Sequence, residues 1–120
     1  MPFVAFLDAN VLYPAVLRDV LLSIAEAGVF QIRWSPDVLD EMEHAVARRV
    51  ARTTSQPARA QEGAAYVRRL MEESFPEAMV ERGAYARLIP SMTNDPKDRH
   101  VLAAAVAGRA DVLVTFPEAC

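Results

Sequence analysis

Apolar residues occur along the chain in two patterns, short continuous runs and longer repeats at helical spacing. Residues 3–7 and 111–115 are short runs rich in bulky apolar residues, which are typical of strands buried on both faces of a parallel sheet. Residues 30–34 alternate in polarity and predict another strand. A shorter apolar run near residues 87–89 predicts one more. We therefore expect four strands.

The intervals between these runs carry apolar residues at the spacing of a helix face. Pro14 suits a first helical turn and Gly28 a helix stop, so a helix is predicted between them. Ser35 can cap a helix that has Pro36 at its first position. The pattern predicts further helices over residues 36–52, 58–74, 76–83 and 96–108. Strands that alternate with helices imply right-handed crossovers, so we expect an α/β fold with a parallel sheet.

Length and composition narrow the class of protein. The 120 residues are 52% hydrophobic and 24% charged, which fits one globular domain over residues 1–120. No apolar stretch approaches the roughly 18 residues that a membrane span needs, and the N-terminus lacks signal-peptide features. We therefore expect a cytoplasmic protein with no membrane partner. Cys120 is the single cysteine, so a disulfide framework or a cysteine-ligated zinc site within one chain is excluded.

The net charge of −3 argues against binding of nucleic acid by overall charge alone. The charges are unevenly distributed, however. Residues 1–47 hold seven acidic and two basic residues, whereas residues 48–69 hold Glu62 as their one acid together with six arginines: Arg48, Arg49, Arg52, Arg59, Arg68 and Arg69. Two interpretations of this arginine segment stay open, a solvated helix face and a surface that contacts phosphate groups.

Asp8 is the first candidate functional residue, because it directly follows the first predicted strand. In parallel α/β sheets, ligands and chemistry collect beyond the carboxyl ends of the strands. Asn10 follows two residues later, on roughly the same side of the backbone. Two further acids, Glu41 on the second predicted helix and Asp98 near the start of the last one, could join Asp8.

Asp98 shares a helix face with Val101 and Leu102, which directs its carboxylate toward the sheet. A carboxylate drawn toward an apolar face needs a partner. Where several such groups come from separate elements, one divalent cation can be the partner of all of them, and oxygen ligands favour Mg²⁺ or Mn²⁺ over zinc. We therefore expect Asp8, Glu41 and Asp98 to lie close enough to share a cation.

Each acid also has a structural interpretation. Asp8 can cap the turn that follows it, and Asp98 is favoured near a helix N-terminus by the helix dipole. Glu41 can be one of the acids that an exposed helix carries routinely. Asp95 precedes Pro96 and is interpreted first as an N-cap.

The remaining polar candidates have weaker signals. Asn10 can stabilise a turn. His44 and His100 have no metal-like spacing to each other or to a cysteine, and both are interpreted as structural or surface residues.

Four segments in order resemble the sequence blocks of a prokaryotic PIN domain, a family that includes the VapC-type ribonuclease toxins. They are Phe6–Ala15, Trp34–Glu41, Asn94–Ala105 and Ala110–Phe116, and together they span nearly the whole chain. Each block alone is a weak signal, but four in family order are a strong one. The resemblance implies a three-layer α/β/α sandwich around a parallel sheet of strand order 3-2-1-4-5.

The resemblance also implies roles for individual residues. The three metal-binding acids of the family, which are its catalytic residues, are matched by Asp8, Glu41 and Asp98. Asn10 resembles the polar residue beside the first acid, and Asp95 resembles an auxiliary acid. Thr115 matches a hydroxyl position after the fourth strand, where it helps to fix the site.

The chain departs from the family pattern after Phe116. Family members usually continue with Asn or Asp, a short helix and a fifth strand, whereas residues 117–120 here are Pro, Glu, Ala and Cys. The fourth polar site residue is therefore missing from its expected place, and Glu118 is close but out of register. Without a fifth strand, the strand at residues 111–115 would form a sheet edge, which proteins usually cover. We expect a homodimer, or a displaced segment, along that edge.

The leading hypothesis is a Mg²⁺-dependent ribonuclease that hydrolyses RNA, as the toxin of a toxin–antitoxin pair whose partner is an antitoxin protein. The arginine segment would hold the RNA backbone near the acidic site. One alternative is a catalytically impaired PIN scaffold that acts as a binding module. The other is a phosphotransfer enzyme of the haloacid-dehalogenase kind, which ranks lower because that family needs Asp-x-Asp where this chain has Asp8-Ala9-Asn10.

Overall fold

The computed structural model describes residues 3–116 of the chain. In this part the sheet has three parallel strands in the order β2-β1-β3, namely β1 (Val4–Leu7), β2 (Gln31–Arg33) and β3 (Val112–Val114). Ala5 of the middle strand is paired with Ile32 on one side and with Val112 on the other. Three of the four predicted strands are therefore confirmed, and the sheet is parallel as expected.

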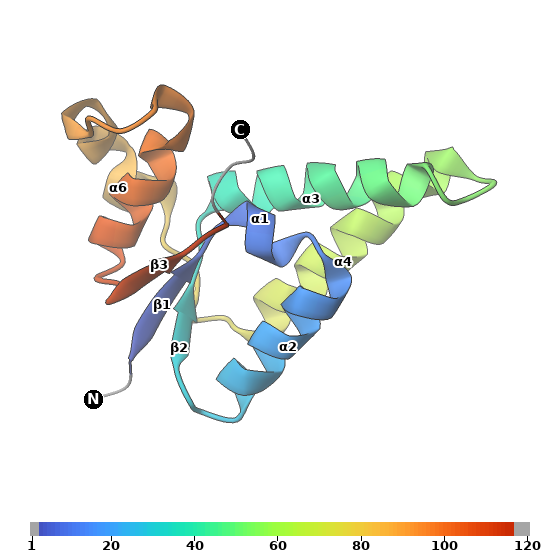
Figure 1. Ribbon diagram of the computed structural model, residues 1–120, viewed down its shortest axis with the longest axis horizontal. Helices are drawn as coiled ribbons and strands as arrows, with labels where there is room; N and C mark the ends of the chain where they lie inside the picture. Colours follow the sequence, from blue (N-terminus) through green and yellow to red (C-terminus); the bar gives the residue numbers. More distant parts are fainter. Residues whose placement is uncertain (1–2, 117–120) are drawn as a thin grey trace.

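Helices cover both faces of the sheet (Figure 1). One face carries α5 (Arg82–Tyr85), the 3-10 helix η2 (Ala86–Ser91) and α6 (Arg99–Ala107). The other carries α2 (Ala15–Glu26), α3 (Pro36–Ala51) and α4 (Ala60–Ser74), and the last two form a hairpin whose tip points away from the sheet. Three short elements connect these helices: α1 (Ala9–Leu12), η1 (Pro57–Arg59) and η3 (Pro96–Asp98). The arrangement is the predicted three-layer α/β/α sandwich.

Local signals at two helix ends act as the sequence predicts. The buried Ser35 caps α3, because its Oγ accepts a hydrogen bond from the Val38 N–H at 3.1 Å, and Pro36 is the first residue of that helix. α2 ends shortly before Gly28, whose φ of 83° lies in the left-handed region that glycine adopts without strain. These caps fix where α3 leaves the sheet and where the chain turns back into β2.

Two predicted elements are wrong. The helix predicted over residues 76–83 is absent from residues 76–81 and only its last two residues are helical, as the start of α5. Residues 76–81 instead run alongside the end of β2, where the Trp34 N–H donates to the Ala78 carbonyl at 3.0 Å and the Val80 N–H donates to the Trp34 carbonyl at 2.8 Å. Residues 87–89 form part of η2 rather than a strand. Their apolar side chains pack on the core from a tight helix next to α6, so a short apolar run was mistaken for a strand.

The single bridge between Trp34 and Met79 therefore lies on the outer side of β2, where the resemblance places a third strand. Trp34 anchors this corner of the molecule, since its side chain is fully buried and its ring meets the edge of Phe75 at a centroid distance of 6.0 Å and an angle of 84°. The buried Trp34 and the partly buried Phe75, together with two backbone hydrogen bonds, hold this side of the sheet.

None of the helices within residues 3–116 is long and apolar enough to cross a membrane.

Substitution of Gly108 tests how closely the end of α6 packs against Val80. A Cβ added there would lie 2.7 Å from Cγ2 of the buried Val80 and 3.2 Å from the Ala104 carbonyl oxygen, so we expect Gly108→Ala to lower the free energy of unfolding by about 1–3 kcal/mol. Gly63, in the interior of α4, has open space around it, so Gly63→Ala should raise that free energy by about 0.5–1 kcal/mol. Urea unfolding of both variants measures the difference, and equal effects of the two changes would contradict it.

Candidate active site

Asp8 stands at the carboxyl end of the central strand and at the start of α1. One carboxylate oxygen accepts a hydrogen bond from the Ala9 N–H at 2.7 Å, which confirms the capping interpretation. The other accepts from the Thr115 hydroxyl at 2.8 Å. Asp8 thus has a structural task, and both of its oxygens already have protein partners.

Asn10 ties α1 to the residues that follow β3. Its amide nitrogen donates to the Thr115 hydroxyl and to the Phe116 carbonyl, both at 3.0 Å, while its amide oxygen accepts from the Phe116 N–H at 3.1 Å. Since a hydroxyl has only one proton, the 2.8 Å contact to Asp8 is the best use of the Thr115 donor. Asp8, Asn10 and Thr115 therefore form one hydrogen-bonded cluster at the sheet edge.

Asp95 and Asp98 lie on the opposite side of this cluster, at the entry to α6. The Asp95 carboxylate accepts from the Lys97 N–H at 3.2 Å, so its predicted role as an N-cap is confirmed, here for η3. Asp98 occupies the cap position of α6 without a capping hydrogen bond from its side chain. It lines a hollow of about 290 Å³ together with Val101 and Leu102, as its helix face predicts.

Glu41 is paired with a histidine that the sequence interpretation left out of the site. The Nε2 of His100 lies 2.6 Å from Oε1 of Glu41, with the histidine side chain 17% exposed and the glutamate side chain 51% exposed. The hydrogen bond to Glu41 raises the pKa of His100 above its ordinary value against the opposing effect of burial, and the charges of Asp37 and Asp8 act in the same direction as Glu41. His100 is therefore part of the acidic site rather than a bystander.

A second acid near His100 was also missed. Asp37, in the first turn of α3, accepts hydrogen bonds from the Tyr85 hydroxyl and from Arg82. Burial raises the pKa of Tyr85, and its bond to Asp37 adds to the effect. Tyr85 is buried in the core, and nothing local in the sequence indicates that residues 48 positions apart share this bond.

The three predicted acids line one hollow, of about 360 Å³, at the carboxyl edge of the sheet. Its lining also includes Asn10, His44 and Arg48. Within residues 3–116, however, no three His, Cys, Asp or Glu side chains are gathered closely enough to hold a metal ion. The carboxylates of Asp8 and Glu41 are instead engaged with Ala9, Thr115 and His100.

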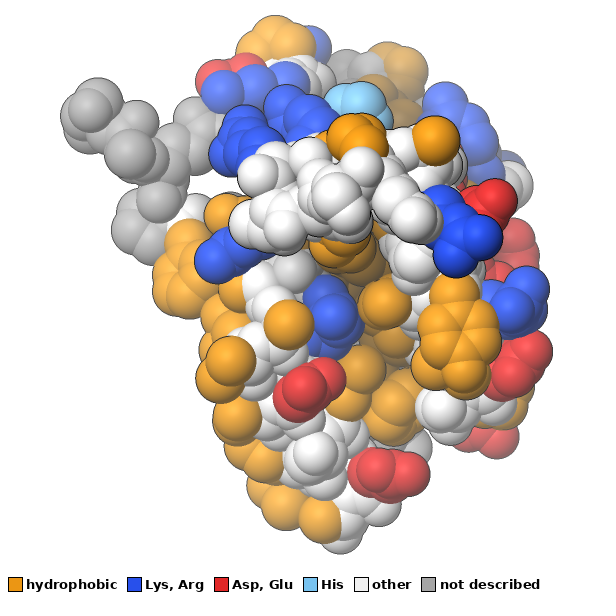
Figure 2. Space-filling view, turned by 90° about the vertical axis from the view of Figure 1, so that its right-hand side faces the viewer, with side chains coloured by type: hydrophobic (Ala, Val, Ile, Leu, Met, Phe, Trp, Pro, Cys, Tyr) orange, Lys and Arg blue, Asp and Glu red, His pale blue; other side chains and the backbone are white. Residues whose placement is uncertain are grey.

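A neighbouring hollow of about 520 Å³ is lined by arginines. Its walls come from the end of α3 and from the turn after α1, and comprise Tyr13, Ala45, Arg48, Arg49, Arg52 and Thr53. Figure 2 views the molecule from the side of the hairpin tip, and most of the basic side chains on this face lie in its upper half, the half that α3 occupies. The structure thus places part of the arginine segment beside the acidic hollow.

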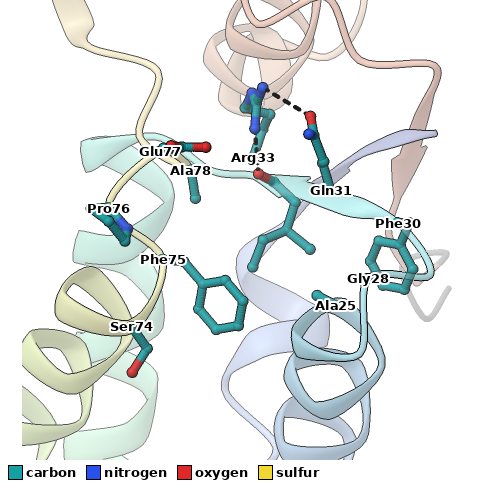
Figure 3. A pocket seen from close by; sticks show the side chains of 11 residues that line it. Ala25, Gly28, Phe30, Gln31, Arg33, Ser74, Phe75, Pro76, Glu77 and Ala78 are labelled. Atoms are coloured by element: carbon teal, nitrogen blue, oxygen red, sulfur yellow. Dashed lines mark hydrogen bonds between the residues drawn. The ribbon is translucent and has the colours of Figure 1, made fainter. Parts of the chain in front are cut away.

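Another hollow lies beside the outer edge of β2, and Asp8, Glu41 and Asp98 are not part of its lining (Figure 3). It measures about 480 Å³, its lining includes Ile32 and Ala25, and Phe75 points into it. Above it, the Arg33 guanidinium donates to the Ile32 carbonyl at 3.0 Å and so occupies a backbone acceptor that faces the open edge. No cluster of acids lines this hollow, and it holds none of the predicted site residues.

The pairing of His100 with Glu41 predicts a pH-dependent contribution to stability. A histidine whose pKa is raised in the folded state stabilises fully below its unfolded pKa of about 6.5, and this contribution is lost as pH rises through the folded pKa. The difference in unfolding free energy between wild type and His100→Gln should therefore shrink as pH rises from about 5.5 to 8.5. Urea unfolding across that range measures it, with the exposed His44→Gln as control. A difference that stays constant with pH would contradict the charged pair.

The comparisons with known proteins agree with this architecture. A family model described as PIN domain matches residues 4–117, which is nearly the entire chain. Neither a curated protein nor a solved structure gives a significant match. PIN domains are generally nucleases, and they typically use divalent metals. A match of this extent, on a parallel α/β/α fold, shows that the chain belongs to the PIN domain family.

Proposed function

We propose that this PIN domain is a metal-dependent endoribonuclease of the VapC type. The observation that supports the proposal best is the joint lining of one hollow by Asp8, Glu41 and Asp98, which come from three separate elements. The hollow lies where parallel α/β folds collect their chemistry. An arginine-lined hollow adjoins it, which suits a polyanionic substrate.

The donor groups match a hard divalent cation in kind. Carboxylates are the ligands that Mg²⁺ and Mn²⁺ prefer, and no cysteine lies among the described residues to favour a softer metal. Binding would require the carboxylates to turn toward one point. Glu41 can do so without losing His100, because its hydrogen bond uses only Oε1 and leaves Oε2 for another partner. Asp8, Glu41 and Asp98 are thus the proposed ligands.

In the proposed mechanism, the chain's own residues position the reactants. A bound cation would supply Lewis-acid activation and neutralise charge at the phosphate. Thr115 and the N-terminus of α1 hold the Asp8 carboxylate at the sheet edge, and His100 fixes one oxygen of Glu41. Arg48, on the rim of the acidic hollow, offsets the repulsion between these carboxylates and a phosphate backbone. In this mechanism the nucleophile is water, and the acids of the lining act as ligands and not as covalent nucleophiles.

A second function is favoured by one specific observation. The carboxylates are engaged with protein partners, and no group of three ligands is gathered within residues 3–116. A PIN scaffold that binds RNA or protein without cleaving it would look the same. The fourth polar site residue of the family has no counterpart at its expected place, and Glu118, which is close but out of register, lies outside the described residues.

The biological setting that we propose follows from the family type. The chain would act in the cytoplasm as the toxin of a toxin–antitoxin pair, with RNA as substrate and an antitoxin protein as partner. A small neighbouring reading frame whose product binds this chain and blocks cleavage would support that setting.

Substitution of the three acids separates the nuclease from the scaffold. Asp8→Asn, Glu41→Gln and Asp98→Asn should each lower Mg²⁺- or Mn²⁺-dependent cleavage of a single-stranded RNA by about two orders of magnitude or more. Asp8→Asn should leave the melting temperature nearly unchanged, since Asn can also cap α1. The exposed Glu73→Gln and Asp19→Asn serve as controls. If the wild type binds metal but cleaves no RNA, the nuclease proposal is wrong and the scaffold function is supported instead.

We also propose a homodimer that covers the edge of β3. Within residues 3–116 this strand is paired only with β1, and Val112 and Phe116 are 39% and 51% exposed along it. Sedimentation at micromolar concentration should show a dimer, and Val112→Lys should shift it toward monomer. A strictly monomeric species whose β3 amides are protected from hydrogen exchange would refute this proposal.

A further inference from the structure

The six arginines of the arginine segment fall into separate groups once the chain is folded. Arg68 is held between α3 and α4 by acids, because it is paired with Asp40, with Glu72 at 2.8 Å and with Glu43 at 3.5 Å. A guanidinium with three carboxylate partners has little capacity left for a phosphate. Arg68 therefore braces the helix hairpin and does not belong to a substrate surface.

Arg59 and Arg69 lie elsewhere on the hairpin. Arg59 caps α4 by position, and the Arg69 guanidinium lies 5.4 Å from the centroid of the Tyr66 ring. Neither residue lines the acidic hollow or the arginine-lined hollow next to it. Both are exposed, and they provide matched controls of the same residue type.

The remaining three line a single hollow at the C-terminal end of α3, with Arg48 and Arg49 in its last turn and Arg52 as its C-cap residue. None of them forms an ion pair with another residue in the described part of the chain. Three cations that converge on one concave surface without carboxylate partners are arranged for a polyanion.

This hollow adjoins the acidic one. The two share Tyr13, Ala45 and Arg48 in their linings, so a ligand that contacts these three residues can reach into both hollows. An α-helix rises 1.5 Å per residue, so Arg48 and Arg52 lie about 10 and 16 Å along α3 from Glu41. A stacked strand advances about 3.4 Å per nucleotide, so this path accommodates about three to five nucleotides.

An aromatic ring stands at the junction of the two hollows. Tyr13 ends α1, and the Arg49 guanidinium lies 5.9 Å from the centroid of its ring. A ring at that place can contact a base only if the base is not already paired and stacked within a duplex. Arginine and an aromatic ring together are the usual means of holding a single strand.

We propose that Tyr13, Arg48, Arg49 and Arg52 form a binding track for single-stranded RNA that leads away from the acidic site along α3. The proposal rests on the proposed nuclease function for its direction, because the acidic hollow is taken as the cleavage end. The arginines contact successive phosphates, and Tyr13 contacts a base next to the cleaved bond. The track explains why a chain with a net charge of −3 can still hold an anionic substrate.

The test measures binding rather than cleavage. A fluorescein-labelled single-stranded RNA of about twelve nucleotides is titrated with protein in EDTA at several salt concentrations. The triple variant Arg48→Ala/Arg49→Ala/Arg52→Ala should bind at least about tenfold more weakly, and its log–log salt slope should be shallower by about 2, which corresponds to three lost phosphate contacts on a single strand. Arg59→Ala/Arg69→Ala/Arg87→Ala loses the same charge from exposed positions and should leave the slope unchanged.

Tyr13 gives an independent arm. Tyr13→Ala should weaken binding about tenfold at every salt concentration with an unchanged slope, whereas Tyr13→Phe should bind like the wild type. Melting curves of all variants ensure that folded proteins are compared. Equal loss of affinity in the two triple variants, equal affinity for an RNA duplex of the same length, or equal competition by an acidic peptide would overturn the track.

The outcomes also separate this proposal from the nuclease. If the protein binds RNA through these arginines but cleaves none, the proposed binding track is supported and the proposed nuclease function is wrong. If the arginine triple variant still cleaves RNA with an unchanged KM, the proposed nuclease function is supported and the proposed binding track is wrong.

Discussion

β1 is hydrogen-bonded to a neighbouring strand on each side, and its residues from Ala5 to Leu7 are buried. A charged side chain at any of these three positions would therefore be buried in the core. The first position at which a polar side chain can emerge is the residue after the strand, which is Asp8. All other parts of the candidate site are placed relative to that point. α1 begins there, β3 ends beside it, and the neighbouring strand β2 leads through Trp34 into α3, which carries Glu41.

The parts of this arrangement that sequence predicts are those with a local cause. A buried apolar run followed by Asp8 predicts β1. Ser35 and Pro36 predict the start of α3. Both predictions succeed because burial and capping depend on residues that are adjacent in the sequence. The sequence predicts a helix where residues 76–81 are not helical, because the bridge to Trp34 that holds them is a long-range interaction. The contacts between His100 and Glu41 and between Tyr85 and Asp37 are of the same kind, and no spacing rule foretells them.

Hydrogen-bond donors and basic groups offset part of the negative charge of the candidate site. Three acids near one sheet edge would repel one another if they were left alone. The chain relieves this repulsion with a histidine at Glu41, a hydroxyl at Asp8 and an arginine on the rim of the hollow. The same acidic character explains why the arginines at the end of α3 are kept apart from the one that braces the hairpin. Arg68 forms ion pairs with acids within the fold, whereas Arg48, Arg49 and Arg52 line a hollow at the surface.

The side-chain amide of Asn10 bonds to both backbone groups of Phe116, in the way that a neighbouring strand would. It acts as one extra rung at the end of the sheet, supplied by a helix instead of a strand. A parallel edge strand such as β3 could otherwise slide by two residues and keep its apolar face inward. With this rung in place, sliding would break the bonds to Phe116 and withdraw Thr115 from Asp8. The register of the sheet and the shape of the acidic site are therefore locked together, so an error in strand pairing would disassemble the site itself.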